Sequence, residues 1–194
     1  MGGDARSMIG RMALQDAILA ALFDDESSGY DLAKSFDITV ANYWTASPQQ
    51  LYRELDRMET AGLVQARVVA QAKRPDKRVF RLTASGRKAL QEFTAREPKP
   101  IAIRDELLVQ VEAMDTGDSD AVREHVAAMQ AAARTKLERY LRRRDKMLAG
   151  RTEDEYLAQE ERIGAYLTLA RGILFEKENV RWARMTLKVL DART

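Results

Sequence analysis

The polar face of one short helix carries side chains of the types that can read the edges of base pairs. The segment SPQQLYRELDRMETAGLV spans residues 47–64, and its leucines and methionine recur at the spacing of one buried helix face. The outer face carries Gln49, Arg53, Asp56 and Thr60, flanked by Tyr52 and Arg57. Because arginine pairs with guanine and glutamine with adenine in a major groove, this face is suited to bind DNA. An ordinary solvated helix face is the alternative interpretation.

The sequence marks both ends of this helix. Ser47 and Gln50 have the spacing of a capping box, and Pro48 fits the first helical position, where its missing N–H costs nothing. Gly62 is of the type that ends a helix, with Leu63 packing back. The pattern therefore predicts a helix that starts and stops within this segment.

A cluster of positive charge follows the helix. Asp76 is the only acid between residues 67 and 88, whereas the basic residues there are Arg67, Lys73, Arg74, Lys77, Arg78, Arg81, Arg87 and Lys88. The runs VQARVVAQ and KRVFRLT alternate as strands do and flank the turn AKRPD, so they predict a hairpin. Because the whole chain carries a net charge of only +2, this local excess favours an anion-binding surface over a solvated loop.

The order of elements around the hairpin predicts the fold. Helices are expected over residues 12–23, from residue 28 through YDLAKSF, over the opening segment, and over ASGRKALQEFTA with Thr83 as its cap. Three helices, a basic hairpin and a fourth helix make a winged helix-turn-helix, whose third helix enters the major groove. We therefore predict a mainly α fold with a small β wing (α+β) and a DNA-binding domain over residues 12–97.

This fold assigns roles to the polar residues of the helix and the hairpin. Contacts to bases or the adjacent backbone are expected from Gln49, Gln50, Arg53 and Arg57. Contacts to phosphates are expected from Tyr52, Lys73, Arg74, Lys77 and Arg78.

Beyond the proline-containing boundary REPKPI, residues 101–194 are predicted to be helical. One long helix is expected over residues 119–148, and another begins at the capping box of Thr152 and Glu155 and reaches Leu190, with weak points at Gly164 and Gly172. Helices this long cannot bury their apolar stripes within such a short segment, so a homodimer is predicted. A two-fold dimer would present two recognition helices to half-sites roughly 34 Å apart.

The residues that enzymes and metal sites need are scarce. The chain has no cysteine, its single His125 lies in the helical pattern VREHVAAMQ, and no glycine-rich phosphate loop occurs. We therefore expect no enzymatic activity, cofactor or metal site. No apolar stretch approaches the ~18–20 residues that span a bilayer, so a cytoplasmic location is expected. The start, MGGDARSMIGR, lacks the apolar run of a signal peptide and is either a native leader or an addition for expression.

The chain resembles the PadR-like transcriptional regulators over nearly its whole length. AILAALFDDESSGYDLAKSF is similar to that family's first two helices, and LARGILFEKENVRWARMTL to the last helix of its longer subgroup. The recognition-helix and wing motifs are matched by Tyr52, Leu55, Arg57, Met58, Glu59, Gly62, Leu63, Leu82, Thr83 and Gly86. Arg53 stands where the family commonly has proline, so base reading there can differ. The resemblance implies a dimeric repressor of an inverted-repeat operator, released by ligands such as phenolic acids or planar drugs, whose identity does not carry over.

A candidate effector site lies on the last predicted helix. Trp182 has Met185 three residues on, and the same helix carries Tyr166, Phe175 and Arg181, which could provide aromatic walls and a cation for a planar carboxylate. The alternative is that Trp182 belongs to the core. A different class of function also stays open, namely a protein-interaction module that is built on the same winged helix and helical dimer but does not contact DNA.

Overall fold

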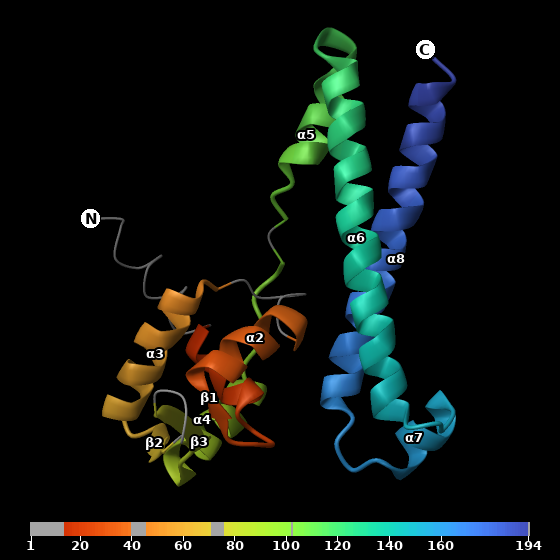
Figure 1. The fold of residues 1–194 in the computed structure, drawn as a ribbon. Helices are drawn as coiled ribbons and strands as arrows, with labels where there is room; N and C mark the ends of the chain where they lie inside the picture. Colours follow the sequence, from red (N-terminus) through yellow and green to blue (C-terminus); the bar gives the residue numbers. More distant parts are fainter. Residues whose placement is uncertain (1–13, 40–45, 71–75, 102, 194) are drawn as a thin grey trace, which may run out of the picture. The chain divides into compact units, whose positions relative to one another are not determined.

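The computed structural model describes residues 14–39, 46–70, 76–101 and 103–193, and Figure 1 traces the chain. The chain divides into two compact units, Met1–Lys99 and Pro100–Thr194. No helix within the described ranges is both long and apolar enough to span a lipid bilayer.

The first unit is a winged helix-turn-helix. A helix over residues 14–21 is followed by β1 (Ser27–Ser28), α2 (Gly29–Thr39), α3 (Pro48–Thr60), β2 (Val64–Val69), β3 (Lys77–Leu82) and α4 (Ala84–Thr94). β2 and β3 form the predicted hairpin, with Val64 opposite Leu82 and Val69 opposite Lys77. The predicted mainly helical fold with a small β wing is confirmed.

The wing sheet contains a strand that the sequence did not predict. β1 pairs antiparallel with β3, with Ser27 opposite Phe80 and Ser28 opposite Val79. The strand order is therefore β1-β3-β2, which makes β3 central and β2 an edge strand. Two serines carry no strand propensity, so only their pairing with β3 defines β1.

The apolar positions of the first unit meet in one core. Leu51, Leu55 and Met58 of α3 are each at most 1% exposed, so the predicted buried face of this helix is confirmed. Burying a side chain of this size stabilises the fold by about 1.5–3 kcal/mol. The same core includes Leu14, Ile18, Leu19, Leu22, Leu32, Phe36, Val64, Phe80 and Leu82.

Both ends of α3 are fixed as the sequence predicted. The Ser47 hydroxyl accepts from the Gln50 amide at 3.2 Å, and the Gln50 side chain accepts from the Ser47 amide at 2.8 Å. At the other end Gly62 has φ +70°, a left-handed conformation that favours glycine. The Leu63 amide then donates to the Met58 carbonyl at 2.9 Å, which closes the helix. The direction of α3 is thus set by local hydrogen bonds at both termini.

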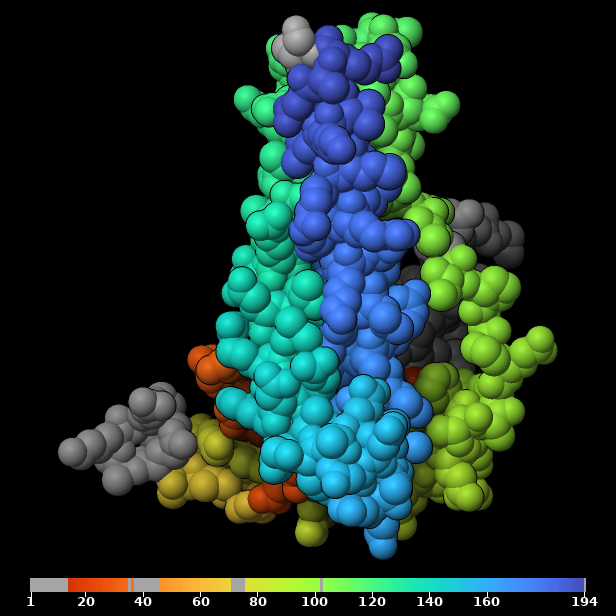
Figure 2. Space-filling view, turned by 90° about the vertical axis from the view of Figure 1, so that its right-hand side faces the viewer, coloured from red at the N-terminus to blue at the C-terminus, as the bar shows by residue number. Residues whose placement is uncertain are grey.

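The second unit is helical. It comprises α5 (Glu106–Ala113), a 3₁₀ turn (Met114–Thr116), α6 (Ser119–Leu148), α7 (Glu153–Gln159) and α8 (Gly164–Asp191). α6 and α8 lie side by side along their length (Figure 2). One apolar cluster joins Val122 and Val126 of α6 to Ala183 of α8, and a second joins Tyr140 to Leu169 and Ile173, so the two helices run antiparallel.

The prediction that a single helix, with weak points at Gly164 and Gly172, runs from Thr152 to Leu190 is wrong, because two helices cover this segment. α7 ends at Gln159, the next residue Glu160 has an extended backbone with ψ 128°, and α8 begins only at Gly164. Arg151 holds the turn by pairing with Glu160 at 3.2 Å and lying over the Tyr156 ring at 4.9 Å. Of the two predicted weak points, Gly164 marks the break, whereas Gly172 lies buried within α8.

Candidate nucleic-acid interface

The outer face of α3 exposes the polar residues that were predicted to read DNA. Gln49, Arg53 and Arg57 are exposed, and the Tyr52 side chain is 43% exposed. Gln49 and Arg53 make no hydrogen bond or ion pair with other residues in the described part of the chain. Their donors are therefore available to an external partner.

Two other predicted contacts of α3 are already engaged within the protein. The Gln50 side chain forms the capping box with Ser47. The Arg57 guanidinium donates to Glu54 at 2.9 Å, and Glu54 is buried although it carries a carboxylate. Sequence reasoning missed Glu54; its place one residue before Leu55, on the edge of the apolar stripe, is the signal that could have found it.

Tyr52 is held in place by a glycine on the neighbouring helix. A Cβ on Gly29 would lie 2.4 Å from Tyr52 Cε1, so only glycine lets the ring approach the start of α2 this closely. The Tyr52 ring therefore packs against Gly29 while the residue stays 43% exposed, so that its hydroxyl could donate to a phosphate.

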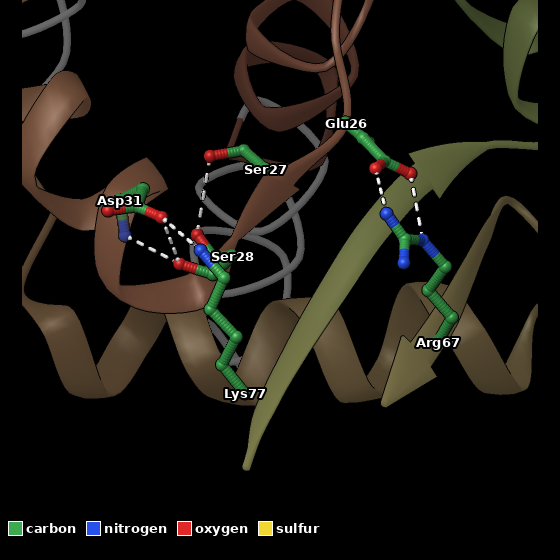
Figure 3. A network of polar contacts seen from close by, with 6 residues as sticks. All are labelled: Glu26, Ser27, Ser28, Asp31, Arg67 and Lys77. Carbon is green, nitrogen blue, oxygen red and sulfur yellow. Dashed lines mark hydrogen bonds and ion pairs between the residues drawn. The ribbon is translucent and has the colours of Figure 1, made fainter. Parts of the chain in front are cut away.

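Two cations of the wing pair with carboxylates that precede or begin α2. Lys77 Nζ lies 3.2 Å from an Asp31 oxygen that also accepts from the Ser28 hydroxyl at 2.6 Å (Figure 3). Arg67 binds both carboxylate oxygens of Glu26 (Figure 3). The Ser28 hydroxyl and then Lys77 lower the pKa of Asp31, and Arg67 lowers the pKa of Glu26.

Arg78 lies against α3. Its Nη1 donates to Asp56 at 2.8 Å and its Nη2 donates to Glu59, while the guanidinium lies 5.0 Å from the centre of the Phe80 ring. The hydrogen bond to Asp56 is the main cause that raises the pKa of Arg78, so this residue stays charged. Lys73 and Arg74, the other predicted phosphate contacts of the wing, lie outside the described residues.

The remaining basic residues of the cluster have weaker or neutral partners. Arg81 donates to the Gln65 side chain at 3.1 Å. Arg87 lies over the Phe23 ring at 5.8 Å, and the exposed Lys88 lies 3.9 Å from Glu92. Such exposed contacts contribute little, so these cations remain available to an anion.

The predicted effector residues are spread along α8. Tyr166 is 1% exposed, and its ring centre lies 4.9 Å from that of Tyr156 of α7 with the two rings tilted by 36°. Trp182 packs half-buried against Val122 and Val126, about 24 Å further along α8 at 1.5 Å per residue. On α8, Met185 and Phe175 are exposed, and the exposed Arg181 pairs with Glu178 at 2.8 Å. The physical reason is that helical spacing distributes these side chains over several turns.

Comparison with known proteins relates both units to transcription factors. Residues 18–92 match the model of the transcriptional regulator PadR-like family, and residues 103–191 match that of the virulence activator alpha C-terminal domain. The chain is 33% identical over 192 residues to the probable transcriptional regulator Rv1176c of Mycobacterium tuberculosis, covering 94% of this chain and 100% of the relative. It is 27% identical over 183 residues to the negative transcriptional regulator PadR of Bacillus subtilis, covering 92% and 97%.

The chain also shares its fold with a protein whose structure has been solved in complex with DNA. The structure of Bacillus subtilis PadR with operator DNA matches with a TM-score of 0.73 and 24% identity over 92% of this chain and 97% of that chain. The same protein has been solved with p-coumaric acid, with a TM-score of 0.66 and 24% identity over 93% and 97%. The relatives are regulators of transcription and not enzymes, and together these matches cover both units. The chain belongs to the PadR-like family of transcriptional regulators.

Proposed function

We propose that this transcriptional regulator is a repressor that binds an inverted-repeat operator as a homodimer and is released by a small aromatic or amphipathic ligand. The observation that carries the proposal is the outer face of α3 beside a basic wing, where Gln49 and Arg53 are exposed and have no polar partner among the residues that the structure describes. Arg53 and Gln49 would contact base edges, Arg57 and Tyr52 the adjacent backbone, and Lys73, Arg74 and Lys77 the phosphates. The similarity to Bacillus subtilis PadR, solved with operator DNA, supports this assignment.

Dimerisation is supported by apolar surface that the second unit leaves uncovered. On α8, Leu174 is 63% and Met185 59% exposed, and on α5 Val109 is 69% exposed. A helical face of this kind normally packs against another helix, and a second copy of the chain would provide one. The residues concerned are Leu108, Val109, Leu167, Leu174, Phe175, Met185 and Val189.

Replacing Leu174 with glutamate tests the dimer. Sedimentation should show weaker self-association for Leu174→Glu than for Lys177→Glu, which places glutamate at an exposed polar position of α8 and changes the charge by two units instead of one, so that a pure charge effect would be larger in the control. Equal association of both variants with the wild type would place the interface elsewhere.

The effector site is proposed around Trp182 and Met185 at the dimer seam. Trp182 is half-buried and Met185 exposed, so a ligand could contact both where a second protomer closes the site. Trp44 is the other of the two tryptophans in the sequence, so a Trp44→Phe variant leaves Trp182 as the sole indole. Titrating this variant with phenolic acids and planar cations should quench Trp182 emission as DNA is released. If the same ligands release DNA equally well from folded Trp182→Ala protein, the site does not include this residue.

The DNA-binding claim is tested with the full chain and duplexes selected from a randomised pool. Binding should weaken steeply with salt, and selection should enrich two inverted half-sites per duplex. Absence of salt-dependent duplex binding would favour the alternative, a protein-interaction module without DNA contact. Reporter transcription with the selected duplex in the promoter distinguishes repression from activation.

A further inference from the structure

The carboxylates around the wing neutralise much of its charge. Of the four cations on β2 and β3, Arg67, Lys77 and Arg78 form ion pairs with acids from outside the hairpin, and Arg81 donates to Gln65. Each acid belongs to a segment on which the wing lies: Glu26 precedes β1, Asp31 is on α2, and Asp56 and Glu59 are on α3. The strands of the wing are thus tied to the helices and do not form a free cationic arm.

Arg78 has the most demanding of these arrangements because it bridges two carboxylates. Its two terminal nitrogens donate separately to Asp56 and Glu59, which lie almost one turn apart on α3. The planar fork of an arginine can hold two acceptors at once, whereas a lysine ammonium acts as a point charge. Contact with the Phe80 ring at 5.0 Å further limits where the guanidinium can lie.

The contacts of Arg78 with Asp56 and Glu59 form a junction between α3 and the wing, and Glu59 extends this junction to the edge strand β2. One of its oxygens accepts from the Ala66 amide of β2 at 3.3 Å, while the other accepts from Arg78 of β3. A carboxylate on α3 therefore satisfies an outward amide of β2 and a side chain of β3 together. Both strands are fixed to the helix that would read the bases.

We infer that Arg78 is a positioning residue that sets the angle between α3 and the wing through Asp56 and Glu59, and is not itself a phosphate contact. The inference rests on the proposed function, because it concerns how α3 and the wing engage DNA together. It revises the sequence-based expectation for Arg78. The sequence could not distinguish the two roles, since both require an arginine at this position.

The two roles differ in their salt dependence. A lost phosphate contact flattens the slope of log K against log salt by about 0.9 on duplex DNA. Arg78→Gln should leave the slope on a mixed-sequence duplex unchanged. The matched control Arg53→Gln removes an exposed arginine of α3 that pairs with no residue in the described ranges. It should change the slope if Arg53 touches a phosphate and the selectivity if it touches a base. A slope flattened by about 0.9 in Arg78→Gln would overturn the inference.

Positioning should instead appear in selectivity. Arg78→Gln should lower the ratio of affinities for the selected and mixed-sequence duplexes by roughly 5- to 150-fold, the value of one displaced base contact. Arg78→Lys should lower this ratio of affinities as well, because a lysine ammonium cannot bridge both carboxylates. An unchanged ratio in folded Arg78→Gln, or full restoration by lysine, would contradict the assignment.

Releasing Arg78 from its acids gives the converse test. The Asp56→Asn/Glu59→Gln variant should bind the mixed-sequence duplex with a slope steeper by about 0.9, and adding Arg78→Gln should abolish that gain. If the slope stays steeper when Arg78→Gln is added, the two acids act by repelling the phosphates and not by holding Arg78, which would count against the junction.

A measurement without DNA separates this inference from the proposed function. Urea unfolding is measured for Arg78→Gln, for Asp56→Asn/Glu59→Gln and for the variant that combines them. The losses of stability should be non-additive, so that the combined variant is no less stable than the less stable of the other two. Additive losses would show that the groups do not interact, and would overturn the inference even if DNA binding is confirmed. Non-additivity with no duplex binding by the wild type would uphold the junction and refute the proposed function.

Discussion

Replacing Gly86 with alanine should destabilise the first unit strongly, because the first turn of α4 lies directly against the backbone of Leu63. A Cβ at this position would lie 2.1 Å from the Leu63 carbonyl oxygen and 3.1 Å from the carbonyl carbon. That oxygen also accepts from the Thr83 amide at 3.1 Å, and the Thr83 hydroxyl caps α4 by accepting from the Gly86 amide at 3.0 Å. The methyl group must therefore push α4 away by about 1 Å and loosen its cap, since interiors tolerate little added volume.

The expected cost combines two effects. Overpacking costs about 1–3 kcal/mol, and loss of an N-cap costs about 1 kcal/mol. The total of roughly 2–4 kcal/mol should lower the urea midpoint of the first unit by about 1–2 M for an m-value near 2 kcal/mol/M. Circular dichroism across a urea titration measures this, with the second unit as a separate transition.

Ser85→Ala is the matched control, because Ser85 is exposed one residue earlier on the same helix. Its effect should stay within about 0.5 kcal/mol. Equal midpoints for Gly86→Ala and Ser85→Ala would refute the close approach of α4 to Leu63.

Two further outcomes follow from α2. Gly29→Ala places a Cβ 2.4 Å from the Tyr52 ring, and because the ring is the end of a flexible side chain, it should swing away. Duplex binding should then weaken while the urea midpoint changes little; a large loss of stability would contradict this account. Ser28 and Lys77 lower the pKa of Asp31 below its ordinary value of 3.8. The charged Asp31 therefore stabilises the fold fully above pH 3.8, and this contribution is lost as the pH falls through the lowered pKa. After correction for the intrinsic pH dependence of amide exchange, the protection of β3 amides should fall there in the wild type, and the fall should be smaller in Asp31→Asn; identical profiles would remove Asp31 from the wing contact.

Local signals made the first unit predictable from the sequence. Ser47, Gln50 and Gly62 act within a few residues of themselves, so the limits of α3 follow from hydrogen bonds that any chain with this pattern would form. The alternation of the two wing strands and the spacing of Leu51, Leu55 and Met58 report burial in the same direct way.

The features that escaped prediction depend on residues far apart in the chain. β1 exists only through its pairing with β3, and Arg78 meets acids nineteen and twenty-two positions earlier. The sequence marked Gly164 as a weak point, but the contacts that accompany the break, the pairing of Arg151 with Glu160 and of the Tyr156 ring with the Tyr166 ring, join residues nine and ten positions apart. Helical periodicity correctly placed Trp182 and Tyr166 on one helix. It could not show which other helix each side chain packs against, and therefore whether the two contribute to one site.

The most direct test of base reading by α3 compares two duplexes with two variants. Arg53→Gln and Gln49→Ala should each cost roughly 1–3 kcal/mol on the duplex selected by the wild type, and less on a mixed-sequence duplex. Thr60→Ala, further along the same exposed face, is the control for general effects on the helix. Equal losses on both duplexes for Arg53→Gln and Gln49→Ala would contradict the claim that α3 reads sequence.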